Sequence, residues 1–306
     1  MEGQLDFVGK RIWFFVFSLI VISIGVVFLI ISPGLKPGID FTGGSTLRLS
    51  FENDVTQGDI RTKLSELGHD GAIVQKMTSG VETDYFIRVG VLQLPEKKLL
   101  LSSLQESLSP DGINELSFDL VSPIVASETV LNAFYAVLAS VIGIFLYIWW
   151  AFRNMPSPLK YGFAAILALA HDSLIVIGIF SMLGYLFDIE VNSMFLIALL
   201  TVVGYSVNDT IVVFDRVREN IILYPARSLR DNANSAIAES LGRSLNTSLT
   251  LLFTLLALML FGGDTIKEFL WVLSIGVIAG TYSSLAIATP VLFSWENKDF
   301  SKLFNR

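Results

Sequence analysis

The run VNSMFLIALLTVVGYSVNDTIVVF, residues 191–214, decides how this chain folds. It has the length and the apolar character of a membrane-spanning helix, for which about 20 residues suffice. Its interior nevertheless holds Asn208 and Asp209. A carboxylate inside such a helix costs about 3 kcal/mol to insert and usually belongs to an ion pathway or a proton relay. The run therefore predicts a membrane protein that depends on a polar group held among its helices.

The composition also indicates a protein that crosses the bilayer several times. Of 306 residues, 53% are hydrophobic and 16% are charged, and the mean hydropathy is +0.64. Soluble domains average about 25% charged residues. The chain has no cysteine, which excludes disulfides and thiol catalysis, and its two histidines argue against a multi-histidine metal site. We expect neither a metal nor a cofactor.

Six apolar runs are predicted to span the membrane. The first follows Lys10 and Arg11 and ends in Ser-Pro-Gly rather than in a cleavage site, so we expect an uncleaved helix. The six predicted spans are residues 12–31, 130–152, 161–187, 191–214, 244–261 and 269–295.

The basic residues predict the orientation of these helices. With the N-terminus in the cytoplasm, most lysines and arginines fall inside, whereas the two short outer loops hold four acids and one lysine. This asymmetry follows the positive-inside rule. We therefore expect a cytoplasmic N-terminus with the first helix, an extracytoplasmic domain, five further helices and a cytoplasmic tail, at residues 1–32, 33–129, 130–295 and 296–306.

The segment between the first two helices predicts a βαββαβ domain of the ferredoxin-like class. Its strands show alternating apolar residues, Thr56–Asp59 forms a capping box, and Thr78–Gly80 is typical of a hairpin turn. The segment is acidic and has no basic patch, so we expect no nucleic-acid binding. The predicted strands are residues 46–51, 73–77, 85–90 and 115–121.

The connection at residues 215–243 alternates charged and apolar side chains around Pro225. This pattern favours an amphipathic helix or helix pair along the inner membrane face. The alternative is a basic anchor that follows the positive-inside rule and has no further structure.

Three of the predicted helices carry polar faces, which together suggest one hydrated core. The faces are formed by Thr201, Tyr205, Asn208 and Asp209 on one helix, by His171 and Asp172 on the preceding one, and by Arg243, Asn246, Thr247, Thr250 and Thr254 on the following one.

Asp209 and Arg243 both lie toward the cytoplasmic ends of their helices, so an ion pair between them is geometrically possible. An aspartate can change its protonation state in such a setting, whereas an arginine cannot realistically lose its proton. Approach and withdrawal of Arg243 would then make a proton relay coupled to helix motion. The alternative is a static ion pair that fixes the register of the helices.

The pair His171 and Asp172 is as compatible with a scaffold as with proton transfer. Ser206 completes a set of residue types found in hydrolases, but the sequence around it lacks the Gly-x-Ser-x-Gly turn. We therefore expect no enzyme and no catalytic residue. Gly276 and Gly280 form a small-xxx-small seam, which predicts close helix packing.

Four stretches resemble motifs of the SecF family, whose members are the smaller subunits of the bacterial SecDF export complex. The most specific is GYSVNDTIVVFDRVREN, residues 204–220. The others are GIDFTGG at 38–44, AHD at 170–172 and SLGRSLNTS at 240–248. The similarity covers essentially the whole chain.

The resemblance implies a polytopic α-helical membrane protein of the bacterial inner membrane. Its six helices would be half of a resistance-nodulation-division (RND) bundle, with one ferredoxin-like α+β extracytoplasmic domain. Asp209 and Arg243 would be the proton-pathway residues, and Asn208, His171, Asp172 and Thr247 would support them. The motif that leads into the outer domain would comprise Gly38, Asp40, Phe41, Gly43 and Gly44.

The resemblance further implies that the proton motive force is used to draw secreted polypeptides outward after SecA action. The implied partners are SecD, the SecYEG translocon, YajC, YidC and the unfolded polypeptide in transit. Both H⁺ and Na⁺ remain open as the coupling ion. The alternatives are a small-molecule exporter subunit of the RND superfamily and an assembly factor that only scaffolds the channel.

Overall fold

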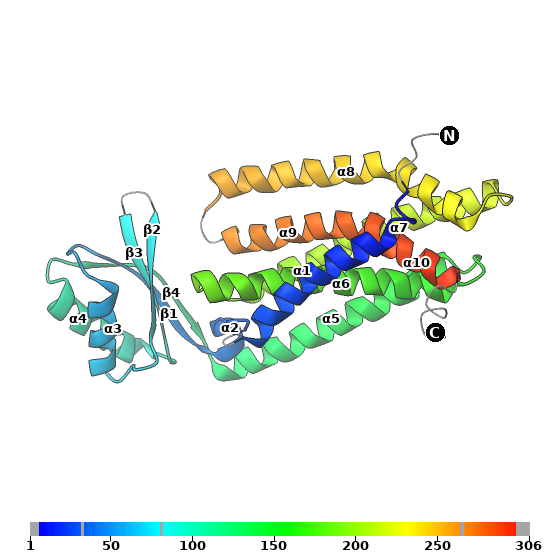
Figure 1. The fold of residues 1–306 in the computed structure, drawn as a ribbon. Coiled ribbons are helices and arrows are strands. Elements are labelled where there is room, and N and C mark those ends of the chain that lie inside the picture. The colour runs from blue at the N-terminus through cyan, green and yellow to red at the C-terminus, as the bar shows by residue number, and fades with distance from the viewer. Residues whose placement is uncertain (1–5, 32–33, 80–81, 264–265, 298–306) are drawn as a thin grey trace. The chain divides into compact units, whose positions relative to one another are not determined.

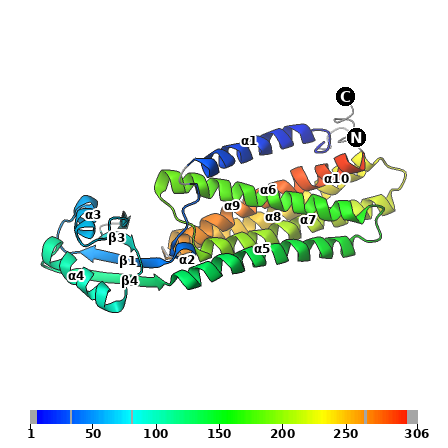
Figure 2. The same ribbon diagram turned by 90° about the horizontal axis from the view of Figure 1, so that it is seen from below.

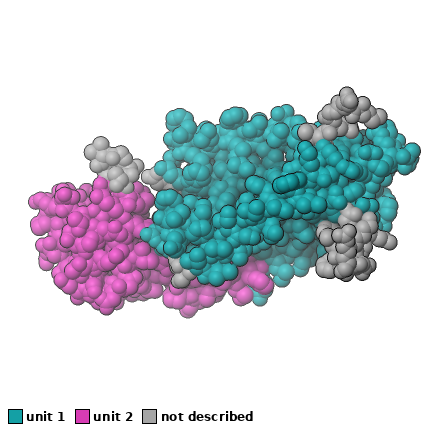
Figure 3. Space-filling model, viewed as in Figure 1, with its two compact units in different colours: residues 1–36, 135–306 teal, residues 37–134 magenta. Residues whose placement is uncertain are grey.

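The computed structural model describes residues 6–31, 34–79, 82–263 and 266–297. The chain divides into two compact units (Figure 3). Unit 2 is Pro37–Phe134, and unit 1 comprises residues 1–36 and 135–306.

Unit 1 is helical, and six helical segments of the described chain are long and apolar enough to cross a membrane (Figures 1 and 2). This agrees with the six predicted spans. The segments are α1 Arg11–Ile30, α5 Pro123–Ala151, α6 Pro158–Phe187, α7 Ser193–Leu223, α8 Leu229–Phe261, and a last one made of α9 Lys267–Ser283, the π-helix η2 Ser284–Ala288 and α10 Thr289–Glu296.

The connection at residues 215–243 is not the separate amphipathic helix or helix pair that we expected. Helix α7 continues to Leu223 and α8 already begins at Leu229. The charged residues extend these helices because they pair along and between them. Arg216 contacts Glu219 one turn away at 2.6 Å and reaches Glu239 of α8 at 2.9 Å. Pro225 lies in the short loop, where it breaks no helix.

Helices α1 and α6 meet at a pair of glycines, Gly25 and Gly178. A Cβ atom built on Gly25 would lie 2.8 Å from the Cα of Gly178. Larger side chains at either position would push the two backbones apart. The first helix is therefore an integral part of the bundle.

Unit 2 is a four-stranded antiparallel sheet in the order β2-β3-β1-β4, with α3 and α4 against one face (Figure 1). The α+β domain that was predicted is therefore present. The central side chains, such as Leu47, Ile60 and Ile87, are fully buried. The elements are α2 Ile39–Thr42, β1 Gly44–Phe51, α3 Gln57–Glu66, β2 Ile73–Ser79, β3 Glu82–Val89, α4 Leu94–Leu108 and β4 Ile113–Val121.

Two local predictions in unit 2 have different outcomes. Thr56 caps α3, and Asp59 returns the hydrogen bond to complete the capping box, as predicted. The hairpin turn was placed too early, because β2 continues through Thr78 to Ser79. Cross-strand pairing with β3 extends to the pair Ser79 and Glu82 and keeps these residues in the strand. Gly80 of the predicted turn lies outside the described residues.

The segment Gly38–Gly44 forms α2 and then turns the chain into β1. Gly43 and Gly44 have φ angles of 74° and 131°, which favour glycine. A side chain on Gly44 would also meet the carbonyl oxygen of Val89 at 2.8 Å. Arg88 holds the segment by donating to the Thr42 hydroxyl at 2.8 Å. These contacts give the motif a structural role within unit 2.

The residues before α1 bind the first two turns of α8. Asp6 accepts hydrogen bonds from Arg230 and, at 2.8 Å, from the Asn234 side-chain amide. Asn234 in turn accepts from the Val8 amide at 3.0 Å. The hydrogen bond from Arg230 is the largest cause that lowers the pKa of Asp6 to about 2. The ionised carboxylate is therefore the form that fastens the two segments.

Replacing Asp6 with asparagine should loosen the start of α8. Because the contact is partly exposed, we expect amide protection there to fall only about two- to fivefold. The lowered pKa makes this contribution fully present above about pH 4 and removes it as the pH falls toward about 2. Hydrogen exchange, corrected for its intrinsic pH dependence, should show a constant difference from the wild type near neutrality that closes in acid. A difference that grows in acid would contradict this assignment.

Candidate functional site

Helices α7 and α9 pack closely enough to bring their polar residues together. A Cβ atom on Gly276 would lie 2.1 Å from a methyl carbon of Val202, and one on Gly280 would lie 2.9 Å from the Cβ of Ser206. Both glycines of the predicted seam thus lie at this contact. They allow α9 to approach the face of α7 that carries Ser206 and Asp209.

Asp209 lies inside the bundle, with 9% of its surface exposed. Its Oδ1 atom accepts a hydrogen bond from the Ser244 hydroxyl of α8 at 2.6 Å. Its Oδ2 atom accepts one from the Ser284 hydroxyl at the start of the π-helix. Asp209 therefore connects three helical segments and faces away from lipid.

Arg243 does not form an ion pair with Asp209 in the described structure, although the sequence made such a pair geometrically possible. Its neighbour Ser244 points at Asp209, and successive side chains on a helix diverge by about 100° because a turn holds 3.6 residues. Arg243 is consequently exposed on the outer face of α8.

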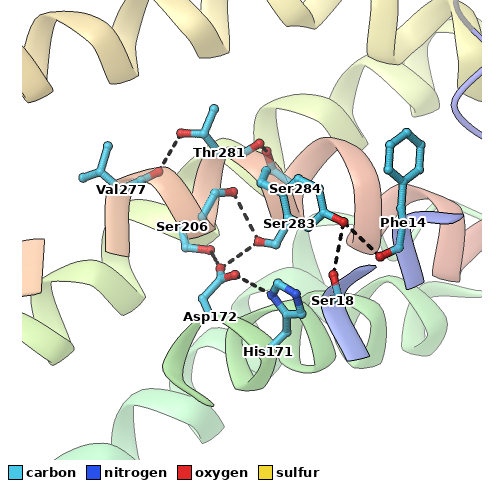
Figure 4. Close-up of polar contacts among 11 residues, drawn as sticks. Phe14, Ser18, His171, Asp172, Ser206, Val277, Thr281, Ser283 and Ser284 are labelled. Atoms are coloured by element: carbon cyan, nitrogen blue, oxygen red, sulfur yellow. Dashed lines mark hydrogen bonds and ion pairs between the residues drawn. The ribbon is translucent and has the colours of Figure 1, made fainter. Parts of the chain in front are cut away.

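A second buried carboxylate, Asp172 of α6, is 1% exposed (Figure 4). It accepts from the Ser206 hydroxyl at 2.5 Å and from the Ser283 hydroxyl at 2.7 Å. Its other oxygen lies 2.9 Å from Nδ1 of His171. The aspartate thus separates Ser206 from His171, which is not the serine–histidine contact of a hydrolase triad.

His171 contributes a further buried polar atom. Its ring is 6% exposed and stacks on Tyr282 with centroids 6.0 Å apart. Its Nε2 atom has no hydrogen-bond partner among the described residues. Tyr282 is itself held by α1, because its hydroxyl donates to the Phe14 carbonyl at 2.9 Å.

The polar side chains that were predicted to form one hydrated core fall into two groups, one buried inside the bundle and one exposed on its surface. Tyr205 and Ser248 bond at 2.8 Å inside the bundle, between α7 and α8. Asn208 is exposed on α7, and Thr247 of α8 donates to the carbonyl of Arg243 at 2.9 Å in its own helix. A Cβ atom built on Gly204 would meet open space. The exposed polar face comprises Thr201, Gly204, Asn208, Arg243, Asn246, Thr247, Thr250 and Thr254.

Sequence reasoning did not identify the hydroxyl partners of the two carboxylates. Ser206 was considered only as a nucleophile, and Ser283 was not considered. The available signal was the pair Ser283–Ser284 inside an otherwise apolar run. Among the residues that the structure describes, no group of three potential metal ligands occurs, and the hydroxyl–carboxylate contacts are suited to binding protons.

Comparisons with known proteins relate this site to one family. Residues 101–298 match the family described as "Protein export membrane protein SecD/SecF, C-terminal". Residues 28–55 match the family described as "SecD/SecF GG Motif". The chain is 41% identical to protein translocase subunit SecF of Thermobaculum terrenum, over 99% of this chain and 98% of that protein. It is 36% identical to SecF of Pseudomonas aeruginosa, over 96% and 92%.

The fold is similar to that of a crystal structure of SecDF, a translocon-associated membrane protein from Thermus thermophilus. The TM-score is 0.83 at 31% identity, and the match covers 97% of this chain. A second SecDF structure, in a super-membrane-facing form, matches with a TM-score of 0.68 at 32% identity over 100% of this chain. The chain spans only 39% and 40% of the lengths of those two chains.

Proposed function

Because the chain belongs to the SecF family of protein translocase subunits, we propose that it forms a SecDF complex with SecD. This complex uses the proton motive force to promote the movement of secreted polypeptides through the SecYEG channel after SecA has acted. The family assignment favours this role over a small-molecule exporter of the RND superfamily.

The observation that carries the coupling proposal is the set of partners around Asp209. Ser244 and Ser284 are both hydroxyl donors. A hydroxyl group can donate to a carboxylate and can also accept from a protonated carboxyl group, so it suits both charge states. A permanent arginine partner would instead favour the charged state alone. The geometry therefore supports a proton relay rather than a static ion pair, and Arg243 would approach Asp209 in another state of the complex.

The exposed polar face supports a partner within the membrane. Polar side chains that face lipid are costly, and such faces usually lie against other helices. SecD would supply the opposing helices, completing an RND-type bundle of two halves. The topology consistent with the positive-inside rule places both termini in the cytoplasm and unit 2 outside. YajC, YidC and the moving polypeptide would be further partners.

A cysteine crosslinking experiment tests the partner surface, because the natural sequence contains no cysteine. Thr254→Cys on the exposed polar face should crosslink to SecD. The matched control is Leu19→Cys, a 64% exposed position of α1 with apolar surroundings. Crosslinking from Leu19 but not from Thr254 would place SecD against α1 and would contradict its binding to the exposed polar face.

Export in membrane vesicles tests the function and the coupling ion. Vesicles with the complex should export a secreted precursor faster than vesicles without it, and a protonophore should remove this difference. The difference should persist in sodium-free buffer. A stimulation that requires sodium, or one that is insensitive to the protonophore, would contradict proton coupling.

A further inference from the structure

Two consecutive serines connect the two buried carboxylates of the bundle. Ser283 donates to Asp172, and Ser284 donates to Asp209. We propose that Asp172, together with His171, is a second proton-binding site, coupled to Asp209 through these two hydroxyls at the start of the π-helix. This inference rests on the proposed function and adds a second proton site to it.

Each serine hydroxyl has two acceptors and a single proton to donate. Ser283 lies 2.7 Å from Asp172 and 3.2 Å from the carbonyl oxygen of Gly280. Ser284 bonds to Asp209 and lies 3.0 Å from the carbonyl oxygen of Thr281. When a proton arrives on a carboxylate, that group needs the hydroxyl less as a donor. The serine can then turn its proton to the backbone carbonyl one turn earlier.

This exchange acts where the last membrane segment departs from α-helical geometry. Residues Ser284–Ala288 form a π-helix between two α-helices. Turns of this kind often lie at functional sites, and hydroxyl bonds to backbone carbonyls bend helices. Because the two serines are adjacent in the chain, a rotation of the backbone at one of them also moves the other.

The surroundings of Asp172 can hold an additional proton. Two hydroxyl donors, Ser206 and Ser283, and the Nδ1 atom of His171 surround the carboxylate, and the tautomer of His171 decides the direction of its hydrogen bond. A proton taken up by this pair has two places to reside, the carboxylate of Asp172 or the imidazole of His171. The unpartnered Nε2 atom of His171 shows that one ring nitrogen is not committed to another hydrogen bond among the described residues. A purely structural pair would be expected to satisfy this buried atom.

The titratable groups that face this site come from three packed elements. His171 lies on the same helix as Asp172, Asp209 is one turn from Ser206 on α7, and Tyr282 stacks on His171 from α9. From α1, Ser18 contacts the Tyr282 hydroxyl at 3.1 Å. No lysine or arginine of the described chain forms an ion pair with Asp172. Protonation of either aspartate therefore changes the local charge directly.

Carbodiimide labelling tests the proposal, because this reagent modifies protonated carboxyl groups in apolar surroundings. The complex with its partner is labelled over a range of pH, and mass spectrometry gives the labelled fraction of Asp172 and Asp209. Both should follow a titration curve. Ser283→Ala retains both acids and removes one donor that favours the ionised form of Asp172, so the labelling midpoint of Asp172 should rise by about one pH unit. The midpoint of Asp209 should shift by about half a unit, although its own serines are intact.

The matched control is Ser181→Ala, which removes a buried hydroxyl of α6 that has no partner in the described structure. It should move neither midpoint. If Asp209 titrates but Asp172 is never labelled, or if Ser283→Ala leaves the Asp209 midpoint unchanged, the second site is wrong. Asp172→Asn provides an independent check, since it should also shift the Asp209 midpoint. If the second proton site is wrong, Asp209→Asn should still abolish proton-dependent export. If the proposed function is wrong, Asp209→Asn should leave export unchanged, so the two failures can be distinguished.

Discussion

Asp209→Asn should reduce export to the level of vesicles that lack the complex, whenever the proton gradient is the driving force. Asparagine has nearly the same size, and it can accept a hydrogen bond from one of Ser244 and Ser284 while it donates to the hydroxyl of the other. The chain should therefore fold and bind SecD. Asparagine cannot gain or lose a proton in this range, so the coupling is removed while the packing is retained. Export should be measured in vesicles with and without a protonophore.

The matched control for this variant is Asp215→Asn. It makes the same chemical change on the same helix, at an exposed carboxylate that pairs with Arg218. Because exposed ion pairs contribute little, export should stay close to that of the wild type. Full proton-dependent stimulation by the Asp209→Asn complex would mean that another residue carries the coupling.

Gly276→Leu should have the largest effect on the folded chain itself. Even the first side-chain atom at this position would lie 2.1 Å from Val202, so α7 and α9 must separate. Overpacking of a core contact typically costs about 1–3 kcal/mol, and a leucine here exceeds the usual insertion. We expect aggregation after detergent extraction, or a clearly lower thermal unfolding temperature in size-exclusion assays.

Gly204→Leu is the informative comparison, because no atom of the described residues lies within 4 Å of a Cβ atom built at that position. The chain should remain folded, whereas its recovery with SecD should fall, since Gly204 belongs to the exposed polar face. Equal loss of folding in both variants would contradict the assignment of Gly276 to an internal contact and of Gly204 to the partner surface.

The sequence was sufficient to predict the six spans and the α+β domain because these depend on apolar length and on residue periodicity. It was also sufficient to single out Asp209, since a carboxylate in an apolar run is costly wherever it lies. The extents of α7 and α8 were underestimated because hydropathy ends at the membrane, whereas the helices continue through charged pairs such as that of Arg216 with Glu239.

The contacts of the site could not be predicted from the same signals. Arg243 and Ser244 are adjacent, and the rotation of α8 about its own axis decides which of them faces Asp209. Helical periodicity alone does not fix that rotation, because packing against neighbouring helices sets it. The π-helix could not be predicted either, since it depends on how the backbone around Ser284 packs against α7 rather than on residue preference.

Proton movement through the reconstituted complex tests the central claim most directly. Liposomes that contain the complex and a pH-sensitive dye are given a proton gradient, and internal acidification is followed for the wild type and for Asp209→Asn. We predict that the wild type conducts protons and that the variant conducts no more than empty liposomes. Equal proton flux in the wild type and the variant would show that Asp209 is not on the proton pathway.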